Sequence, residues 1–195
     1  MRAIAIIPAR GGSLRIPGKN KRMFHGKPII CYSIEAAQRS GLFEGVIVST
    51  DDDDIANIAH KAGAAIHMRP AVLCSDDVGT QVVVQHLASK LYAETPFRRV
   101  CCIYATAPLM DWRDIGRAHS EIDDNHDFAM TVCDDPLSDA AQVYWSRTHY
   151  IMGKPLIGSR TAMIPVDKRR VCDINTEEDW MRAERMYAEL MGQSA

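Results

Sequence analysis

Short apolar runs alternate along the chain with amphipathic segments. The runs at 3–8, 45–50, 64–68, 99–106 and 127–132 are apolar at consecutive positions, which is typical of strands covered on both faces. The segments between them repeat apolar residues at helical spacing. Such an alternation of strands and helices predicts an α/β fold with a mostly parallel central sheet.

Capping residues and periodicity predict five helices, at 28–41, 52–63, 80–92, 112–122 and 176–190. We expect Pro28 near the first turn of the first helix and Thr80 as the cap of the third. Thr176 and Asp179 have the spacing of a capping box at the start of the last helix. The structure can test these start signals.

A chain of 195 residues is most simply one domain, here 1–195. The segment 134–170 is the least regular part, and we expect edge strands or a lid there. The apolar run at the N-terminus is far shorter than the roughly 18 to 20 residues that span a bilayer, so a cytoplasmic protein that does not bind membranes is expected. The net charge of −2 argues against a general nucleic-acid binder.

The cysteines and histidines do not form recognisable metal or disulfide motifs. Six cysteines are dispersed without a C-x-x-C pair, which favours packed, reduced thiols. The seven histidines lack the H-E-x-x-H spacing. No histidine is therefore expected to bind a metal ion.

The segment from Ala9 to Lys27 is strongly basic and contains no Asp or Glu. Its cations are Arg10, Arg15, Lys19, Lys21, Arg22 and Lys27. Gly11 and Gly12 would let backbone N–H groups turn toward an anion, although the segment matches neither common glycine-rich phosphate motif. A solvated basic turn is the alternative, and the absence of a compensating acid favours anion binding.

Residues that follow strands of a parallel sheet are the other candidates, because ligands bind outside the carboxyl ends of such strands. The run Asp51 to Asp54 suggests a metal site, but helix caps explain it better. Asp173 precedes the last helix and could hold Mg²⁺ together with substrate phosphates. Arg69 follows the third strand, where it could contact a base edge or belong to an ordinary surface loop.

Several motifs resemble those of the acylneuraminate cytidylyltransferase family, the CMP-sialic acid synthetases. They are "IPARGGSLRIPGKN", "GKPIICYSIEAA", "VIVSTDD", "MRPAVLCSDD", "YATAPL" and "RRVCDINTEEDW", and "DAAQVYW" is similar to the pseudaminic acid branch. The resemblance implies a three-layer, Rossmann-like nucleotidyltransferase fold. It also implies that a CMP-sugar is made from CTP and a nine-carbon keto acid sugar, with Mg²⁺ as cofactor and pyrophosphate as the second product.

The resemblance assigns roles to residues at the matching positions. The residues that would bind the nucleotide are Ala9, Arg10, Gly11, Gly12, Ser13, Arg15, Lys19, Asn20, Arg69 and Ser75. Tyr104 and Thr106 would contact the sugar, and Asp173 and Asn175 would bind the metal. Arg10, Lys19 and Asp173 would be the catalytic residues, and a homodimer is possible.

The sequence departs from the family pattern at three places. Leu14 occupies a position where the family usually has lysine, and Asn175 replaces the second aspartate of a D-I-D motif. Only "CDDPLS" joins 127–132 to 139–145, where relatives have a longer segment that includes part of a dimerisation arm. One alternative is therefore a shortened paralogue that binds a nucleotide or a partner with little or no catalysis. Another is an enzyme for an eight-carbon 3-deoxy keto acid.

Overall fold

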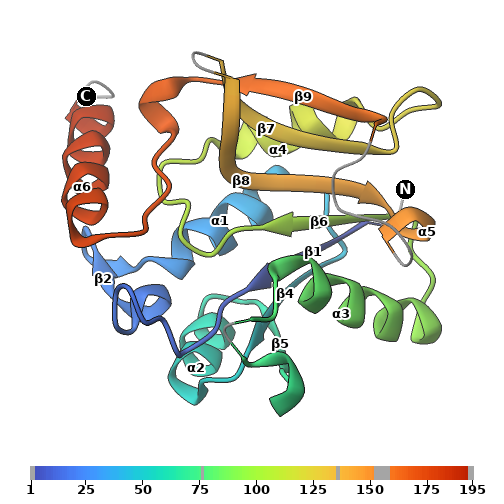
Figure 1. Cartoon of the computed structure of the whole chain (residues 1–195), viewed down its shortest axis with the longest axis horizontal. Coiled ribbons are helices and arrows are strands. Elements are labelled where there is room, and N and C mark those ends of the chain that lie inside the picture. Colours follow the sequence, from blue (N-terminus) through green and yellow to red (C-terminus); the bar gives the residue numbers. More distant parts are fainter. Residues whose placement is uncertain (1–2, 76, 135–136, 152–158, 193–195) are drawn as a thin grey trace.

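The computed structural model describes residues 3–75, 77–134, 137–151 and 159–192. Seven strands form the central sheet, and all except β8 run in one direction. Their order across the sheet is β5 (Ala65–Met68), β4 (Gly45–Thr50), β1 (Ala3–Pro8), β6 (Arg99–Ile103), β8 (Leu137–Arg147), β7 (Phe128–Asp134) and β9 (Thr161–Val166). The predicted mostly parallel sheet is confirmed (Figure 1).

Helices cover both faces of the sheet, which gives the three layers that the resemblance implies (Figure 1). One apolar core joins the sheet to α1 (Ile30–Ser40), α2 (Asp53–Lys61) and α4 (Trp112–Ser120). A second core on the other face includes residues of α3 (Thr80–Glu94) and α5 (Thr148–Ile151). Both faces are therefore apolar, as a sheet between two helical layers requires.

A third core lies at the end of the sheet where α6 (Glu177–Gly192) packs against the N-terminal loop (Figure 1). Trp180 of α6 is buried there with Ile16 and with Phe24 of the hairpin β2 (Met23–Phe24) and β3 (Lys27–Pro28). Short 3-10 helices occur at η1 (Lys19–Lys21), η2 (Ala71–Leu73) and η3 (Lys168–Arg170). The third core fixes the basic loop against the C-terminal helix.

The capping box of the last helix is confirmed. The Asp179 N–H donates to Thr176 Oγ1 at 3.1 Å, and the Thr176 N–H donates to Asp179 Oδ2 at 2.9 Å. Of the two other expected helix starts, the one near Pro28 is displaced by two residues and the one at Thr80 is wrong. Pro28 pairs with Met23 in the hairpin, because its fixed φ also suits extended backbone, and α1 begins two residues later. Gly79 is the N-cap of α3 in place of Thr80, and no side chain caps this helix start.

The segment 134–170 contributes two strands. β9 is an edge strand, as expected, whereas β8 lies inside the sheet between β6 and β7. Residues 135–136 and 152–158 of this segment lie outside the described part of the chain.

All six cysteines are free, as predicted. In the described part of the chain, no helix combines the length and the apolar character needed to cross a membrane.

Candidate active site

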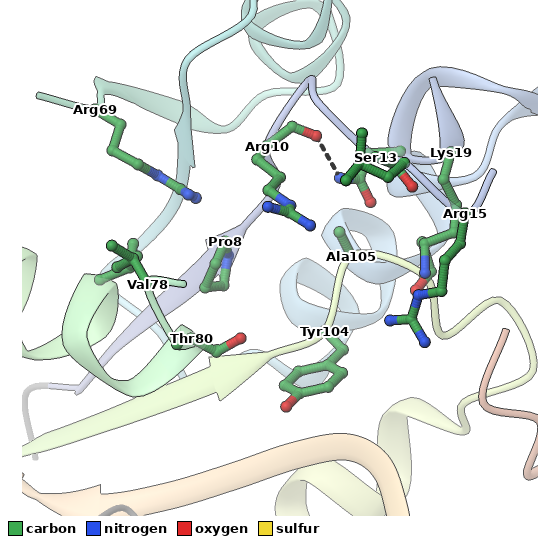
Figure 2. A pocket seen from close by; sticks show the side chains of 15 residues that line it. Pro8, Arg10, Ser13, Arg15, Lys19, Arg69, Val78, Thr80, Tyr104 and Ala105 are labelled. Atoms are coloured by element: carbon green, nitrogen blue, oxygen red, sulfur yellow. Dashed lines mark hydrogen bonds between the residues drawn. The ribbon is translucent and has the colours of Figure 1, made fainter. Parts of the chain in front are cut away.

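A cavity of about 460 Å³ opens at the carboxyl ends of β1 and β6 (Figure 2). The residues that line it are Pro8, Arg10, Ser13, Leu14, Arg15, Lys19, Asn20, Arg69, Val78, Gly79, Thr80, Val83, Tyr104, Ala105 and Thr106. In the sheet, β1 lies between β4 and β6. After β1 the chain forms β4 on one side, and it forms β6 on the other side only later in the sequence. The cavity lies at this change of direction. This is the crevice that open parallel sheets offer to ligands.

The basic loop divides its cations between two tasks. Arg10, Arg15 and Lys19 line the cavity. The other three cations pair with acids from distant segments: Lys21 with Asp52 at 2.8 Å and Asp54 at 2.9 Å, Arg22 with Glu177 at 2.6 Å, and Lys27 with Glu35. The expectation that no acid compensates this loop is therefore wrong, because the compensating acids come from elsewhere in the chain. Fewer of the positive charges of this loop therefore face the cavity than the sequence suggests.

Gly11 does not turn its amide toward the cavity, which corrects the sequence-based expectation. Its N–H donates to Asp51 Oδ1 at 2.8 Å. A Cβ at Gly11 would lie 2.6 Å from Asp52 Oδ2, so glycine is required for this close approach. Asp52 caps α2 by accepting the Ile55 N–H at 3.0 Å, which agrees with the cap interpretation of the acidic run.

Two side chains shape the basic loop around the cavity. Asn20 is buried and donates from Nδ2 to the Arg10 carbonyl at 2.8 Å, the dashed line in Figure 2. Lys19 Nζ donates to the Ile174 carbonyl at 2.6 Å. Burial lowers the pKa of Lys19, and the attraction of Asp173 opposes this effect. Lys19 therefore links the cavity to the C-terminal segment.

Asp173 and Asn175 lie together but are not among the lining residues. Asp173 is exposed, and its Oδ2 accepts Asn175 Nδ2 at 2.6 Å. The Asn175 N–H donates to Asp179 Oδ2 at 3.0 Å, so the capping box of α6 also fixes this segment. The pKa of Asp179 is lowered because these hydrogen bonds outweigh the cost of its burial. Among the described residues, no group of three or more His, Cys, Asp or Glu side chains is placed to bind a metal.

Arg69 enters the cavity from the side opposite to Arg15 and Lys19 (Figure 2). Its guanidinium donates to the Ser49 carbonyl at 2.9 Å, and its buried Nε has no hydrogen-bond partner in the described part of the chain. Burial lowers the pKa of Arg69, against the attraction of Asp51. Ser75 is exposed in the turn that follows and does not line the cavity.

Tyr104 and Thr106, the predicted sugar-contacting residues, both line the cavity. The predicted nucleotide residues Ala9, Gly11 and Gly12 do not, and Ala9 is buried with its N–H bonded to the Ser49 carbonyl. Sequence reasoning missed the lining residues Pro8, Val78, Gly79, Thr80, Val83 and Ala105. Four of these residues lie at or just before the start of α3. The sequence signal for them was their position along the chain alone, because apolar residues at a helix start do not indicate a ligand site.

The geometry suits a ligand with a polyphosphate and a polar organic part. Three cations from one loop can neutralise phosphate oxygens. Arg69, with donors fixed by the Ser49 carbonyl, can face a base edge. Tyr104 and Thr106 offer hydroxyl groups at the end of β6. The arrangement is therefore able to bind a nucleotide beside a second, hydroxyl-rich substrate.

Sequence comparisons agree with this description. The family model described as Cytidylyltransferase matches residues 4–159. A pseudaminic acid cytidylyltransferase from Campylobacter jejuni is 34% identical over 224 residues, which cover 96% of this chain and 97% of the relative. An N-acylneuraminate cytidylyltransferase from Escherichia coli is 39% identical over 108 residues, with 55% of this chain and 25% of the relative covered. The first alignment is longer than the chain of 195 residues, so that relative has residues that this chain lacks.

Solved structures share the fold at low sequence identity. A CMP:2-keto-3-deoxy-manno-octonic acid synthetase complexed with CTP has a TM-score of 0.74 at 16% identity, and the match covers 100% of both chains. A Mycobacterium tuberculosis protein in complex with manganese has a TM-score of 0.70 at 10% identity, covering 95% of this chain and 99% of that one. The second structure contains manganese, and at this identity the likeness shows the fold alone.

Proposed function

The chain belongs to the cytidylyltransferase family, and from this premise we propose that it transfers CMP from CTP to a nonulosonic acid and releases pyrophosphate. The observation that carries the proposal is the cavity at the ends of β1 and β6, where Arg10, Arg15 and Lys19 face Tyr104. Pseudaminic acid is the preferred substrate class, because the relative that aligns over nearly the whole of both chains has that name.

In this proposal each side of the cavity binds one substrate. Arg10, Ser13, Arg15, Lys19 and Asn20 hold the triphosphate and ribose, and Arg69 borders the cytosine. Tyr104 and Thr106 contact the sugar acid. The anomeric oxygen of the sugar then forms a bond to the α-phosphorus, and the bond between the α- and β-phosphates breaks. Positioning and charge neutralisation carry most of the catalysis in such reactions.

Arg10 and Lys19 are proposed as catalytic residues because their charges lie beside the phosphate site. The negative charge on the phosphoryl oxygens and on the leaving pyrophosphate grows as the reaction proceeds. Lys19 is tethered to the Ile174 carbonyl at 2.6 Å, so its ammonium is held in place before the substrate binds. A cation that is already in place does not have to be reoriented during the reaction.

Asp173 and Asn175 would hold Mg²⁺. Asn175 donates one Nδ2 hydrogen to Asp173. The amide oxygen of Asn175 and the carboxylate of Asp173 remain as hard oxygen ligands, the kind that Mg²⁺ prefers. One carboxylate is a sparse set, and substrate phosphates would complete it. When bound, the ion polarises phosphoryl oxygens and lowers the charge of the triphosphate. The homodimer and the cytoplasmic location remain predictions from the sequence.

Pyrophosphate release tests the proposal. Purified protein with CTP and Mg²⁺ is given a panel of pseudaminic, legionaminic and sialic acids, and an eight-carbon 3-deoxy keto acid. We expect release with at least one nine-carbon acid. Pyrophosphate release with the eight-carbon acid alone would mean that this acid, and not a nine-carbon acid, is the substrate. CTP binding without release for every acid would support the non-catalytic alternative.

A further inference from the structure

The peptide group between Arg10 and Gly11 is hydrogen-bonded on both of its polar sides. The Arg10 carbonyl accepts Asn20 Nδ2 at 2.8 Å, the bond drawn in Figure 2. The N–H of the same peptide group, on Gly11, donates to Asp51 Oδ1 at 2.8 Å. Because a peptide group is planar and its C=O and N–H point in opposite directions, these two bonds oppose its rotation. The direction of the loop at this point is therefore set partly by Asp51, which follows β4.

The residues on either side of this peptide group line the cavity. Arg10 lies before it, and its side chain reaches into the cavity. The Gly11 carbonyl accepts the Ser13 N–H at 3.0 Å, so a tight turn leads directly from Gly11 to Ser13, which also lines the cavity. Asp51 is thus connected through Gly11 to two cavity residues, although it does not line the cavity itself.

The other end of the basic loop is bound to the same acidic run. Lys21 ends η1, and its Nζ lies 2.8 Å from Asp52 Oδ2 and 2.9 Å from Asp54 Oδ2. These two ion pairs do not depend on the bond between Gly11 and Asp51. A change at Asp51 should therefore loosen the first part of the loop and leave η1 in place.

Asp51 acts on the cavity through its charge as well as through its hydrogen bond. Its negative charge repels phosphate oxygens, and it also attracts Arg69, another cavity residue. Asparagine and alanine at this position both remove the charge, so they change these two effects alike. Only asparagine keeps an oxygen that can accept the Gly11 N–H. The difference between the two variants therefore reports the hydrogen bond alone.

We propose that Asp51 is a positioning residue for the nucleotide, which acts through the Gly11 N–H and holds the first part of the basic loop in the conformation that binds CTP. A loop that is ordered in advance pays less conformational entropy when the ligand binds. The inference rests on the proposed function, because it concerns how that site binds its nucleotide. It also gives the acidic run a role besides capping α2.

Calorimetry with CTP measures the effect of the hydrogen bond. We expect Asp51→Ala to bind CTP about five-fold more weakly than Asp51→Asn, and Asp51→Asn to stay within about two-fold of the wild type. KM for the sugar acid should change less than about two-fold in both variants, because Tyr104 and Thr106 lie beyond the end of β6 and not on the basic loop.

Asp53→Ala is the matched control. Asp53 is an exposed acid of the same run, and no hydrogen bond joins it to the basic loop in the part of the chain that the structure describes. Its loss removes the same charge two positions away and should leave the Kd for CTP within about two-fold of the wild type. Equal Kd values for Asp51→Ala and Asp51→Asn, or an equal weakening by Asp53→Ala, would overturn the proposal.

Hydrogen exchange of the Gly11 amide, followed by NMR, is a second readout that needs no substrate. The amide should exchange faster in Asp51→Ala than in Asp51→Asn, and Asp53→Ala should exchange like the wild type. Equal exchange rates in the two Asp51 variants would overturn the positioning role. A wild-type protein that binds CTP but releases no pyrophosphate with any acid would refute the proposed function alone, whereas a wild type that does not bind CTP would refute both.

Discussion

Replacing Leu14 by lysine tests directly whether the triphosphate of CTP lies beside the basic loop. Leu14 lines the cavity and is 78% exposed, so a lysine there loses almost no buried apolar surface. An exposed, solvent-screened ion pair contributes up to about 1 kcal/mol. Since 1.4 kcal/mol corresponds to a tenfold change, we expect Leu14→Lys to lower the Kd for CTP about five-fold at low salt.

Calorimetry of CTP and CMP at two salt concentrations measures this effect. The gain should be larger for CTP than for CMP, because CMP lacks the two outer phosphates, and it should shrink at high salt. Leu14→Gln, which adds length and polarity without charge, is the matched control and should bind CTP like the wild type. Equal gains from both variants, or equal gains for both nucleotides, would refute the placement of the triphosphate beside this loop.

Four further predictions concern the residues that hold the site together. Burial lowers the pKa of Lys19, and bound phosphates should raise this pKa again. CTP binding at alkaline pH should therefore be accompanied by the uptake of as much as about one proton. Calorimetry in buffers of different ionisation enthalpy should detect this uptake, and Lys19→Arg should abolish it. Gly11→Ala places a Cβ 2.6 Å from Asp52 Oδ2 and should lower the free energy of unfolding by about 1–3 kcal/mol in urea melts, whereas Gly12→Ala, with nothing within 4 Å, should lower it much less. Thr176→Ala should cost about 1 kcal/mol of stability at neutral pH. The Asp179 carboxylate has a lowered pKa, so its contribution exists above its unfolded-state pKa and disappears as the pH falls through the folded value; unequal stabilities of the wild type and Asp179→Asn in strong acid would contradict this reasoning.

The sequence predicts the parts of the fold that local pattern determines. The bounds of β1 and β4 agree with the predicted runs, because these strands are largely buried on both faces and are apolar over most of their length. The capping box at Thr176 was recognisable because its hydrogen bonds span only three residues. The concentration of basic residues from Ala9 to Lys27 is visible in the sequence, whereas anion binding by this loop stays a prediction.

The remaining features depend on contacts between distant segments. Lys21 meets Asp52 across 31 positions, so nothing near Lys21 in the sequence reveals that its charge is neutralised. β8 lies inside the sheet because both of its faces carry buried residues, a pattern interrupted in the sequence by the bulge at Ala141.

The transfer of label from CTP tests the central claim most directly. CTP labelled at the α-phosphate is incubated with the protein, Mg²⁺ and pseudaminic acid, and the products are separated. The account predicts that the α-label appears in a sugar adduct, while label at the β- or γ-phosphate appears in pyrophosphate. Label that stays in CTP, or that appears only in free CMP without an adduct, would contradict it.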